Sequence, residues 1–165
     1  IDVLSSISTA FSHFAELPAQ KNENIDIIST TKLALEIFNE QNIIFQSKLE
    51  SLNVKIDRTN LIRVITNLIK NAVQATENIK NSKIIVSVKK LRNKAIIEIE
   101  DNGDGIPRKN RDKIFEPKFT TKSKGMWLGL SIIKNLVTNY NGKIDFVSKK
   151  GKTIFKIELP IHNNV

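Results

Sequence analysis

The chain of 165 residues is predicted to fold as an α+β two-layer sandwich, with a mixed sheet of about five main strands covered by about three helices. Two patterns predict this class. Apolar and polar residues alternate in segments 83–91 and 94–100, as in half-buried strands. Between Asp57 and Asn78, apolar residues recur at helical spacing along one stripe, which needs an apolar surface to pack on. A sheet face and a helix stripe can bury each other, so two layers are expected.

Apolar residues spaced alternately three and four apart, from Leu4 to Phe14, predict a short bundle helix over residues 1–17. Pro18 ends this helix, and residues 18–24 are polar and predict a linker. A helix this short is marginal in isolation, so we expect it to pack against another element.

The sandwich is expected to begin after the linker. The sequence predicts a strand over residues 25–28 and a helix over about 30–39, with Ser29 as its N-cap. Residues 43–49 and 54–56 are predicted as the second and third strands.

Asp57 is predicted to cap the longest helix, which extends to about Asn78. Its core-facing stripe is formed by Leu61, Ile65, Leu68, Ala72, Ala75 and Ile79, broadened by Ile62, Ile69 and Val73. A hairpin of strands 83–91 and 94–100 follows, with Arg92 and Asn93 between the strands.

After the segment DNGDGIP the chain has no clear periodicity until Leu128, and a loop of that length inside a compact domain is usually functional or mobile. A helix is predicted from Leu128 to about Asn139, ended by Asn141 and Gly142. Strands 143–147 and 153–159 are predicted to pair through the turn Lys-Lys-Gly-Lys.

Composition and charge exclude several kinds of site. The chain has no Cys, hence no disulfide and no thiolate zinc site, and no apolar run approaches the length of a membrane span. The net charge is +9, and seven basic residues fall between Arg108 and Lys124. A basic cluster beside a glycine-rich loop suits a polyphosphate better than nucleic acid, so we expect no nucleic-acid partner.

The sequence begins at Ile1 rather than Met, so we expect it to be a fragment of a longer protein. We expect a cytoplasmic domain, and we leave open whether upstream segments anchor the longer protein in the inner membrane.

The sequence Asp101-Asn102-Gly103-Asp104-Gly105 directly follows a predicted strand. Gly and Asp disfavour helices and strands, so the run is either a tight turn or a ligand site. Glycines let a backbone approach a ligand closely, and a carboxylate at a strand end can accept a hydrogen bond from an amine.

Asn67 and Asn71 lie four residues apart and share one face of the long predicted helix, at the edge of its apolar stripe. Taken alone, the pair is explained more simply as two amides solvated at the helix edge. The functional interpretation is that an Asn carboxamide oxygen ligates Mg²⁺, which in nucleotide sites usually takes its remaining ligands from phosphates and water.

The segment Gly125-Met126-Trp127-Leu128-Gly129-Leu130 opens a helix directly after the loop Thr-Thr-Lys-Ser-Lys. Free backbone amides at a helix N-terminus, preceded by lysines and hydroxyls, form an anion site. The three signals together, in this order, are much stronger than any one of them.

The segments NLIKNAVQA, DNGDGIP, IFEPKFTTKSKG and GMWLGLSIIKNL resemble, in this order, the N, G1, F and G2 boxes of sensor histidine kinases. These boxes belong to the catalytic ATP-binding domain of the GHKL superfamily, which has the Bergerat ATP-binding fold. The TTKS and FAELP segments are most similar to kinases of the nitrogen-regulation type. The resemblance covers residues 25–160, and residues 1–17 are similar to the end of a dimerisation and phosphoacceptor helix.

The resemblance implies two parts, residues 1–20 as the end of that helix with its linker and residues 21–165 as the catalytic domain. It also implies ATP and Mg²⁺ as cofactors. The partners would be the protein's own phosphoacceptor domain and a response regulator, and the longer protein would be a homodimer. The reaction would transfer the γ-phosphate of ATP to a histidine outside this chain.

The resemblance also implies roles for individual residues. Asp101 would accept a hydrogen bond from the adenine amino group, and Gly103 and Gly105 would let the backbone wrap the base. Asn71 would ligate Mg²⁺, and Asn67 would orient a phosphate or a metal-bound water. Phe115 and Phe119 would anchor the lid, and the rest of the nucleotide site would be formed by Thr120, Thr121, Lys122, Gly125, Gly129 and Leu130. Asn67, Asn71 and Lys122 would be the catalytic residues.

Two residues depart from the family pattern. His13 lacks the acidic residue and proline expected around a phosphoaccepting histidine, so we expect no autophosphorylation of this chain alone. Trp127 stands where the family has glycine, and a non-glycine residue with positive φ costs on the order of 1 kcal/mol or more. Two interpretations stay open: Trp127 weakens nucleotide binding or alters the lid, or its indole points away and the loop tolerates it.

Two other functions compete with histidine kinase activity. ATP-hydrolysing relatives use a glutamate at the position of Asn67 as general base, and an amide cannot accept that proton. A degenerate domain that only senses nucleotide or contacts proteins is the other alternative, and Trp127 is the residue that supports it.

Overall fold

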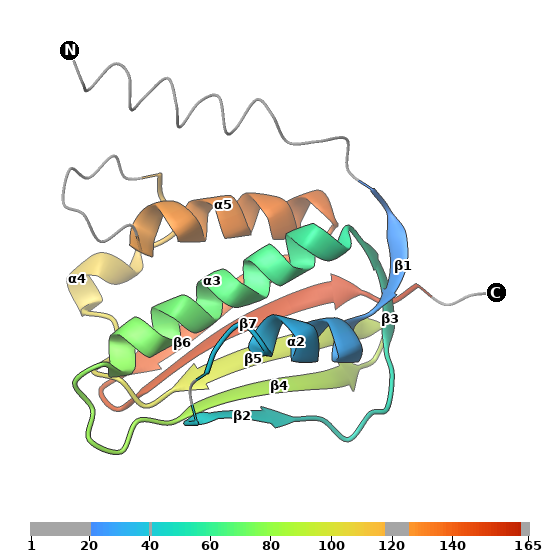
Figure 1. Cartoon of the computed structure of the whole chain (residues 1–165). Helices are drawn as coiled ribbons and strands as arrows, with labels where there is room; N and C mark the ends of the chain where they lie inside the picture. Colours follow the sequence, from blue (N-terminus) through green and yellow to red (C-terminus); the bar gives the residue numbers. More distant parts are fainter. Residues whose placement is uncertain (1–20, 40, 118–125, 163–165) are drawn as a thin grey trace, which may run out of the picture.

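The computed structural model describes residues 21–39, 41–117 and 126–162, and for residues 126–128 the backbone only. Its elements are β1 (Glu23–Asp26), α2 (Ile27–Leu35), β2 (Ile43–Gln46), β3 (Asn53–Ile56), α3 (Arg58–Thr76), β4 (Ile84–Leu91), β5 (Lys94–Asp101), α4 (Arg108–Arg111), α5 (Met126–Asn139), β6 (Lys143–Lys149) and β7 (Lys152–Pro160). Five strands form one sheet in the order β2-β4-β5-β7-β6. Helices α2, α3 and α5 cover one face of this sheet (Figure 1). The predicted two-layer α+β sandwich is therefore confirmed.

The sheet is mixed, as predicted, because β2 pairs parallel to β4 while the other neighbours pair antiparallel. Both predicted hairpins are present. In the first, Leu91 pairs with Lys94, and the turn between them places Arg92 at φ 54°. In the second, Lys149 pairs with Lys152 around a turn that contains Gly151 at φ 79°. Positive φ in a two-residue turn matches the right-handed twist of the flanking strands.

The core lies between the helices and the inner face of the sheet. The predicted stripe of α3 is buried at Leu61, Ile65, Leu68 and Ala72. The predicted N-cap of α3 is also confirmed, because Asp57 Oδ1 accepts a hydrogen bond of 3.0 Å from Asn60 N. This packing holds α3 against the sheet and places the C-terminal half of α3 next to the end of β5 (Figure 1).

The start of the sandwich differs from the sequence prediction. Ile27 and Ile28, predicted as the end of a strand, begin α2 instead. The N-cap is Asp26 rather than Ser29, because the Asp26 carboxylate accepts hydrogen bonds from Ile28 N and Ser29 N. The predicted helix is shifted towards the N-terminus as a result, and it ends at Leu35 rather than near Asn39.

Three further differences concern single elements. β1 and β3 form a separate two-stranded antiparallel sheet in place of two strands of the main sheet, with Ile25 opposite Val54. The short helix α4 falls in the segment expected to lack periodicity, and α5 begins at Met126, two residues before the predicted start. The helix predicted over residues 1–17 lies outside the described residues. In the part that is described, no helix is both long and apolar enough to cross a membrane.

Candidate functional site

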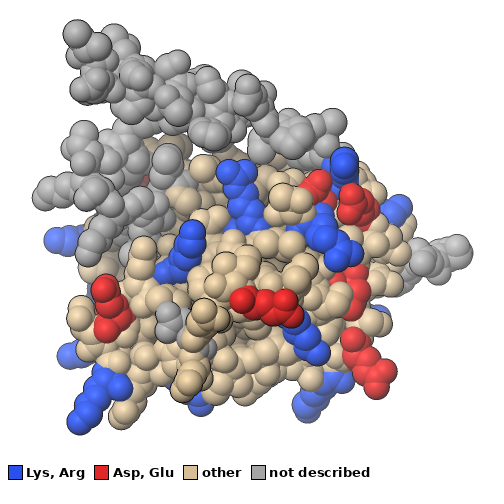
Figure 2. All heavy atoms as spheres, viewed as in Figure 1, with Lys and Arg blue, Asp and Glu red and all other residues tan. Residues whose placement is uncertain are grey.

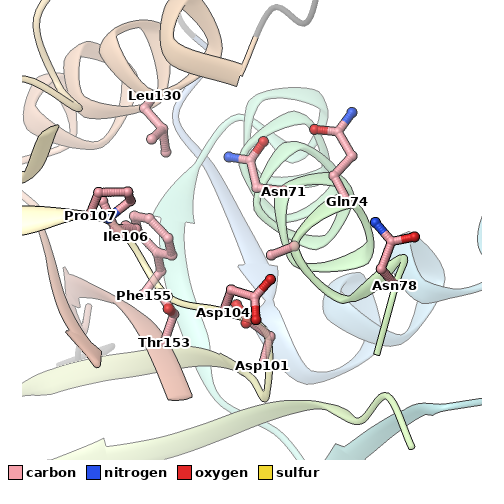
Figure 3. A pocket seen from close by; sticks show the side chains of 12 residues that line it. Asn71, Gln74, Asn78, Asp101, Asp104, Ile106, Pro107, Leu130, Thr153 and Phe155 are labelled. Carbon is pink, nitrogen blue, oxygen red and sulfur yellow. The ribbon is translucent and has the colours of Figure 1, made fainter. Parts of the chain in front are cut away.

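A pocket of about 300 Å³ opens between α3, the loop after β5, the inner face of β7 and the first turns of α5 (Figure 3). It is lined by Asn71, Gln74, Ala75, Asn78, Asp101, Asp104, Gly105, Ile106, Pro107, Leu130, Thr153 and Phe155. Polar side chains from α3 stand across the pocket from the apolar side chains of Ile106 and Phe155. Such a pocket, largely apolar with a few convergent polar groups, is typical of a small-molecule site.

Asp101 is the last residue of β5 and is only 4% exposed. Burial raises its pKa to about 6, although a hydrogen bond of 2.9 Å from Gly103 N to Asp101 Oδ1 opposes the shift and the charge of Glu100 adds to it. Within the described residues no salt bridge joins Asp101 to a cation. Its carboxylate therefore has acceptor capacity left for a ligand in the pocket.

The loop after Asp101 is held tightly between α3 and the β6–β7 hairpin. A Cβ on Gly103 would lie 2.4 Å from the carbonyl oxygen of Ala75, and a Cβ on Gly105 would lie 2.6 Å from that of Lys149. Gly105 also has φ +83°, and Gly103 O accepts a hydrogen bond of 2.9 Å from Gly151 N. Both positions need glycine because backbone from another element occupies the space of a side chain.

Asn102 fastens the same loop on its other side. Its Nδ2 donates to Asn81 O at 2.7 Å, and its Oδ1 accepts from Lys83 N at 2.8 Å. The DNGDG sequence is thus a turn, as the simpler prediction states, and it also lines the pocket through Asp101, Asp104 and Gly105.

Asn71, Gln74 and Asn78 line the pocket from α3 and the residues just after it (Figure 3). Asn67 is not among the residues that line the pocket. Its Nδ2 donates to Arg63 O at 2.8 Å, and its Oδ1 lies 3.9 Å from where a Cβ on Gly129 would be. The two asparagines therefore differ in position: Asn71 faces the pocket, and Asn67 lies beside the first turn of α5.

The structure brings together four of the predicted site residues around the pocket, namely Asn71, Asp101, Gly105 and Leu130. Gly103 lies behind Asp101 and donates to it. Phe119, Thr120, Thr121, Lys122 and Gly125 lie outside the described residues. Phe115 packs edge-on against Phe146, with ring centroids 5.9 Å apart, just before that segment.

Trp127 is the second residue of α5, so its backbone is helical. The argument that a residue in this place needs positive φ therefore does not apply to Trp127. The backbone gives no strain by which this residue would disturb the pocket.

Sequence reasoning gave no site role to the other eight lining residues, Gln74, Ala75, Asn78, Asp104, Ile106, Pro107, Thr153 and Phe155. Strand alternation places Thr153 and Phe155 on one face of β7, but only the pairing of β7 with β5 brings that face next to the site loop, so the sequence alone does not mark them. No local signal marks Gln74 or Asn78 either, since exposed polar side chains on a helix are ordinary.

Comparisons with known proteins agree with the geometry. A family model described as "Histidine kinase-, DNA gyrase B-, and HSP90-like ATPase" matches residues 56–163. The sensory histidine kinase/phosphatase NtrB of Vibrio alginolyticus is 32% identical over 158 residues, which cover 87% of this chain and 45% of that protein. The nitrogen regulation protein NtrY of Azorhizobium caulinodans is 29% identical over 144 residues, covering 82% of this chain and 18% of that protein. The chain thus spans less than half the length of either relative.

Among solved structures, the catalytic domain of histidine kinase ThkA superposes with a TM-score of 0.76 at 29% identity, covering 85% of this chain and 95% of that one. ThkA in complex with the response regulator TrrA superposes with the same TM-score, 0.76, at 26% identity, covering 98% of this chain and 49% of that one. The fold is therefore that of histidine kinase catalytic domains.

Proposed function

Because the chain belongs to the histidine kinase-, DNA gyrase B- and HSP90-like ATPase family, we propose that it is the ATP-binding catalytic domain of a sensor histidine kinase. The observation that carries the proposal is the buried Asp101 carboxylate at the end of a pocket that also contains Asn71. The adenine ring of ATP would lie against the apolar wall formed by Ile106 and Phe155, and Asp101 would accept a hydrogen bond from the adenine amino group. The phosphates would extend past Asn71 towards the start of α5.

The residues on the phosphate side fit Mg²⁺. The described residues contain no cluster of three or more His, Cys, Asp or Glu that could hold a metal by itself. A hard cation that takes most of its ligands from phosphates and water needs only one protein oxygen, and the Asn71 carboxamide can supply it. When bound, Mg²⁺ would neutralise charge on the phosphates. Lys122, Thr120, Thr121, Gly125 and Gly129 stay proposed for the remaining phosphate contacts, and Asn67 for orienting a phosphate or water.

The proposed reaction is transfer of the γ-phosphate to a histidine on a separate domain. Phosphoryl transfer depends mainly on positioning and charge neutralisation, so the site needs no covalent apparatus of its own. Asn67 favours transfer over hydrolysis, because a carboxamide cannot serve as general base for water. Residues 1–20 are proposed to belong to the dimerisation helix and its linker, and a response regulator is proposed to receive the phosphoryl group, as the ThkA–TrrA complex suggests by analogy.

Neither alternative has a specific observation in its favour. The surface charge does not favour a nucleic-acid partner either: on the face seen in Figure 2, Lys and Arg side chains are interspersed with Asp and Glu rather than gathered in one stripe. For the nucleotide-sensing alternative, equal ATP affinities of the wild type and Trp127→Gly would exclude an inhibitory role of the indole.

The test is a calorimetric titration of the chain with Mg·ATP. We expect ATP to bind and little phosphate to be released when no acceptor is present. Asp101→Asn should weaken ATP binding at least tenfold, because losing a charge-assisted hydrogen bond typically costs about 1.4 kcal/mol or more. Glu98→Gln on the opposite face of β5 is the matched control, because it removes a carboxylate remote from the pocket. Absence of ATP binding, or release of phosphate at the rate of an ATPase, would refute the proposal.

Phosphotransfer is tested separately by incubating the chain with labelled ATP and with the longer protein, which carries the histidine-bearing domain and is disabled in its own ATP site. Label on that domain only when the chain is added would support the kinase assignment. ATP binding with no transfer would favour a nucleotide sensor.

A further inference from the structure

Three buried polar residues form a row across the inner face of the sheet at the edge of the pocket. Asp101 on β5 is directly opposite Thr153 on β7, and Thr153 is directly opposite Ser148 on β6. Their exposed fractions are 4%, 3% and 7%. Asp101 and Thr153 line the pocket (Figure 3), whereas Ser148 is not among its lining residues.

Ser148 hydrogen bonds in two directions. Its Oγ accepts a hydrogen bond of 2.7 Å from Ile106 N, which belongs to the loop that lines the pocket. Its Oγ also lies 2.9 Å from Thr153 Oγ1, a distance at which either hydroxyl can donate. These are the two hydrogen bonds that Ser148 Oγ makes with the described residues.

Proton accounting assigns the direction of the second bond. If Thr153 donated, Ser148 Oγ would accept twice and its own buried proton would have no acceptor among the described residues, which is costly. If Ser148 donates, its oxygen accepts once, its proton is satisfied, and the Thr153 proton is left over. Because Thr153 lines the pocket, that proton is available to a ligand.

We propose that Ser148 is a positioning residue for base recognition: by donating to Thr153 Oγ1 it turns the Thr153 hydroxyl into a hydrogen bond donor that faces the pocket. This proposal rests on the proposed ATP-binding function and goes beyond it. An acceptor, Asp101, then stands beside a donor, Thr153. That pattern is complementary to the 6-amino group of adenine and a ring nitrogen lone pair beside it, whereas guanine carries a carbonyl at position 6 and a proton on N1.

The bond from Ile106 N adds a second effect of the same hydroxyl. Ile106 follows Gly105 in the loop and contributes to the apolar wall of the pocket. Ser148 therefore couples the position of this wall to the orientation of Thr153, and removing the hydroxyl changes both.

The experiment measures the affinities of ATP, 1-deaza-ATP and 7-deaza-ATP for the whole chain. Each analogue replaces one of the two ring nitrogens near the amino group with a C–H. We expect the wild type to bind one of the two analogues about three- to tenfold more weakly than ATP, the effect of one neutral hydrogen bond. In Ser148→Ala, ATP itself should bind about three- to tenfold more weakly, and the ratio for that analogue should move towards one.

Further variants separate positioning from mere stability. Ser148→Thr keeps the hydroxyl, so the ratio of ATP affinity to analogue affinity should return to the wild-type value. Thr153→Val should bring this ratio to one, and adding Ser148→Ala to Thr153→Val should not change the ratio further. Ser47→Ala is the matched control, because Ser47 Oγ also accepts a backbone hydrogen bond, from Leu49 N at 3.1 Å, but lies away from the pocket. It should lower stability and leave the ratio unchanged.

Three results would overturn the proposal. If the wild type binds ATP but neither analogue is discriminated, or if the ratio is the same in Ser148→Ala, Ser148 does not position the base contact and the proposed ATP-binding function still stands. If the wild type binds no ATP, both proposals fail together.

Discussion

The Asp101 oxygen that does not bond to Gly103 N can accept a hydrogen bond from the adenine amino group only while that oxygen carries no proton. The pKa of Asp101 is raised to about 6 because it is buried, so near neutral pH the carboxylate is only about tenfold more often ionised than protonated. A ligand that prefers the ionised form will therefore lose affinity as the pH falls through this range.

We predict that ATP affinity of the wild type falls progressively between about pH 7 and about pH 5. Over one pH unit below the pKa, the loss should approach about tenfold. Asp101→Asn, which keeps an oxygen for Gly103 N, should bind ATP more weakly but without this dependence. Fluorescence titration with a labelled ATP analogue measures both, and a parallel pH dependence in the variant would assign the titration to another group.

The residues of the site differ in how far the sequence could predict them. Asp101, Gly105 and Asn71 lie in short motifs whose composition is abnormal for a helix or strand, so the sequence alone marks them. Thr153 carries no such mark, because Thr is ordinary in a strand and becomes informative only through its register opposite Asp101. Register is set by pairing across the sheet, which local sequence does not encode.

At the scale of elements, the site loop is fixed by the β6–β7 hairpin. Gly105 and Gly151 have nearly the same φ, +83° and +79°, but only Gly105 faces a close neighbour, the carbonyl of Lys149. The pair separates the cost of backbone strain from the cost of the clash.

We predict that Gly151→Ala lowers the free energy of unfolding by about 1–2 kcal/mol, the cost of a left-handed alanine. Gly105→Ala should add about 1–3 kcal/mol for the clash and should also weaken ATP binding, since the loop must move away from the hairpin. Urea unfolding and ATP titration of the two variants make the comparison. Equal stabilities would show that the hairpin yields easily and that the loop is not held by it.

The N-terminus of α2 is an element whose start the sequence did not predict correctly. Asp26, and not Ser29, is the N-cap because the Asp26 carboxylate accepts hydrogen bonds from three backbone N–H groups. One of them, Leu52 N at 2.8 Å, belongs to a segment distant in sequence. The tertiary contact to Leu52 decides the start of the helix, and it cannot be read from a local pattern. By contrast, Asp57 caps α3 through a local bond alone, and there the prediction is confirmed.

Asp26→Ala should therefore cost more stability than Asp57→Ala. Loss of an N-cap costs about 1 kcal/mol, and Asp26→Ala additionally leaves Leu52 N without its acceptor, for about 1–3 kcal/mol more. Burial by itself raises the pKa of Asp26, but the hydrogen bonds from Leu52, Ile28 and Ser29 outweigh it and the pKa is lowered. The stability contributed by Asp26 is thus present above its ordinary pKa of 3.8 and is lost as the pH falls further.

Chemical denaturation at neutral and acid pH tests this ordering. The difference between the wild type and Asp26→Ala should shrink below about pH 4. If Asp57→Ala were the more destabilising variant at neutral pH, the contact to Leu52 would have little energetic weight.

At the scale of the whole molecule, the two faces of the sheet differ in how they hold charged side chains. The inner face holds the buried Asp101, while the outer face carries ion pairs such as Lys94–Glu158 at 2.6 Å and Lys156–Glu158 at 2.7 Å. Hydrogen bonds from Lys156 and Lys94 lower the pKa of Glu158 to about 2. The overall sandwich was predictable because hydrophobic period and hairpin spacing agree along most of the chain, whereas this division of charge between the faces follows from strand register.

The two carboxylates make the stability of the ligand-free chain depend on pH in opposite directions. For Asp101 the folded-state pKa of about 6 exceeds the unfolded value of 3.8, so the folded chain binds the proton more tightly and gains stability as the pH falls from about 6 to about 4. For Glu158 the folded-state pKa of about 2 is below the unfolded value of 4.5, so its stabilisation is lost as the pH falls below about 4.5. Solvent screening at the sheet surface reduces the contribution of Glu158 relative to that of the buried Asp101.

The free energy of unfolding should therefore have its maximum on the acid side of neutrality, at about pH 4–5, where ATP binds weakly. Urea unfolding midpoints measured from about pH 3 to about pH 8 locate the maximum. Asp101→Asn should be more stable than the wild type at neutral pH and should lack the rise between about pH 6 and about pH 4, because no charge remains to be buried. A wild-type maximum at neutral pH would mean that Asp101 is ionised at little cost, and the weakening of ATP binding in acid would then need another cause. If the maximum lies in acid, the site keeps a destabilising charge at neutral pH because that charge is what the base requires.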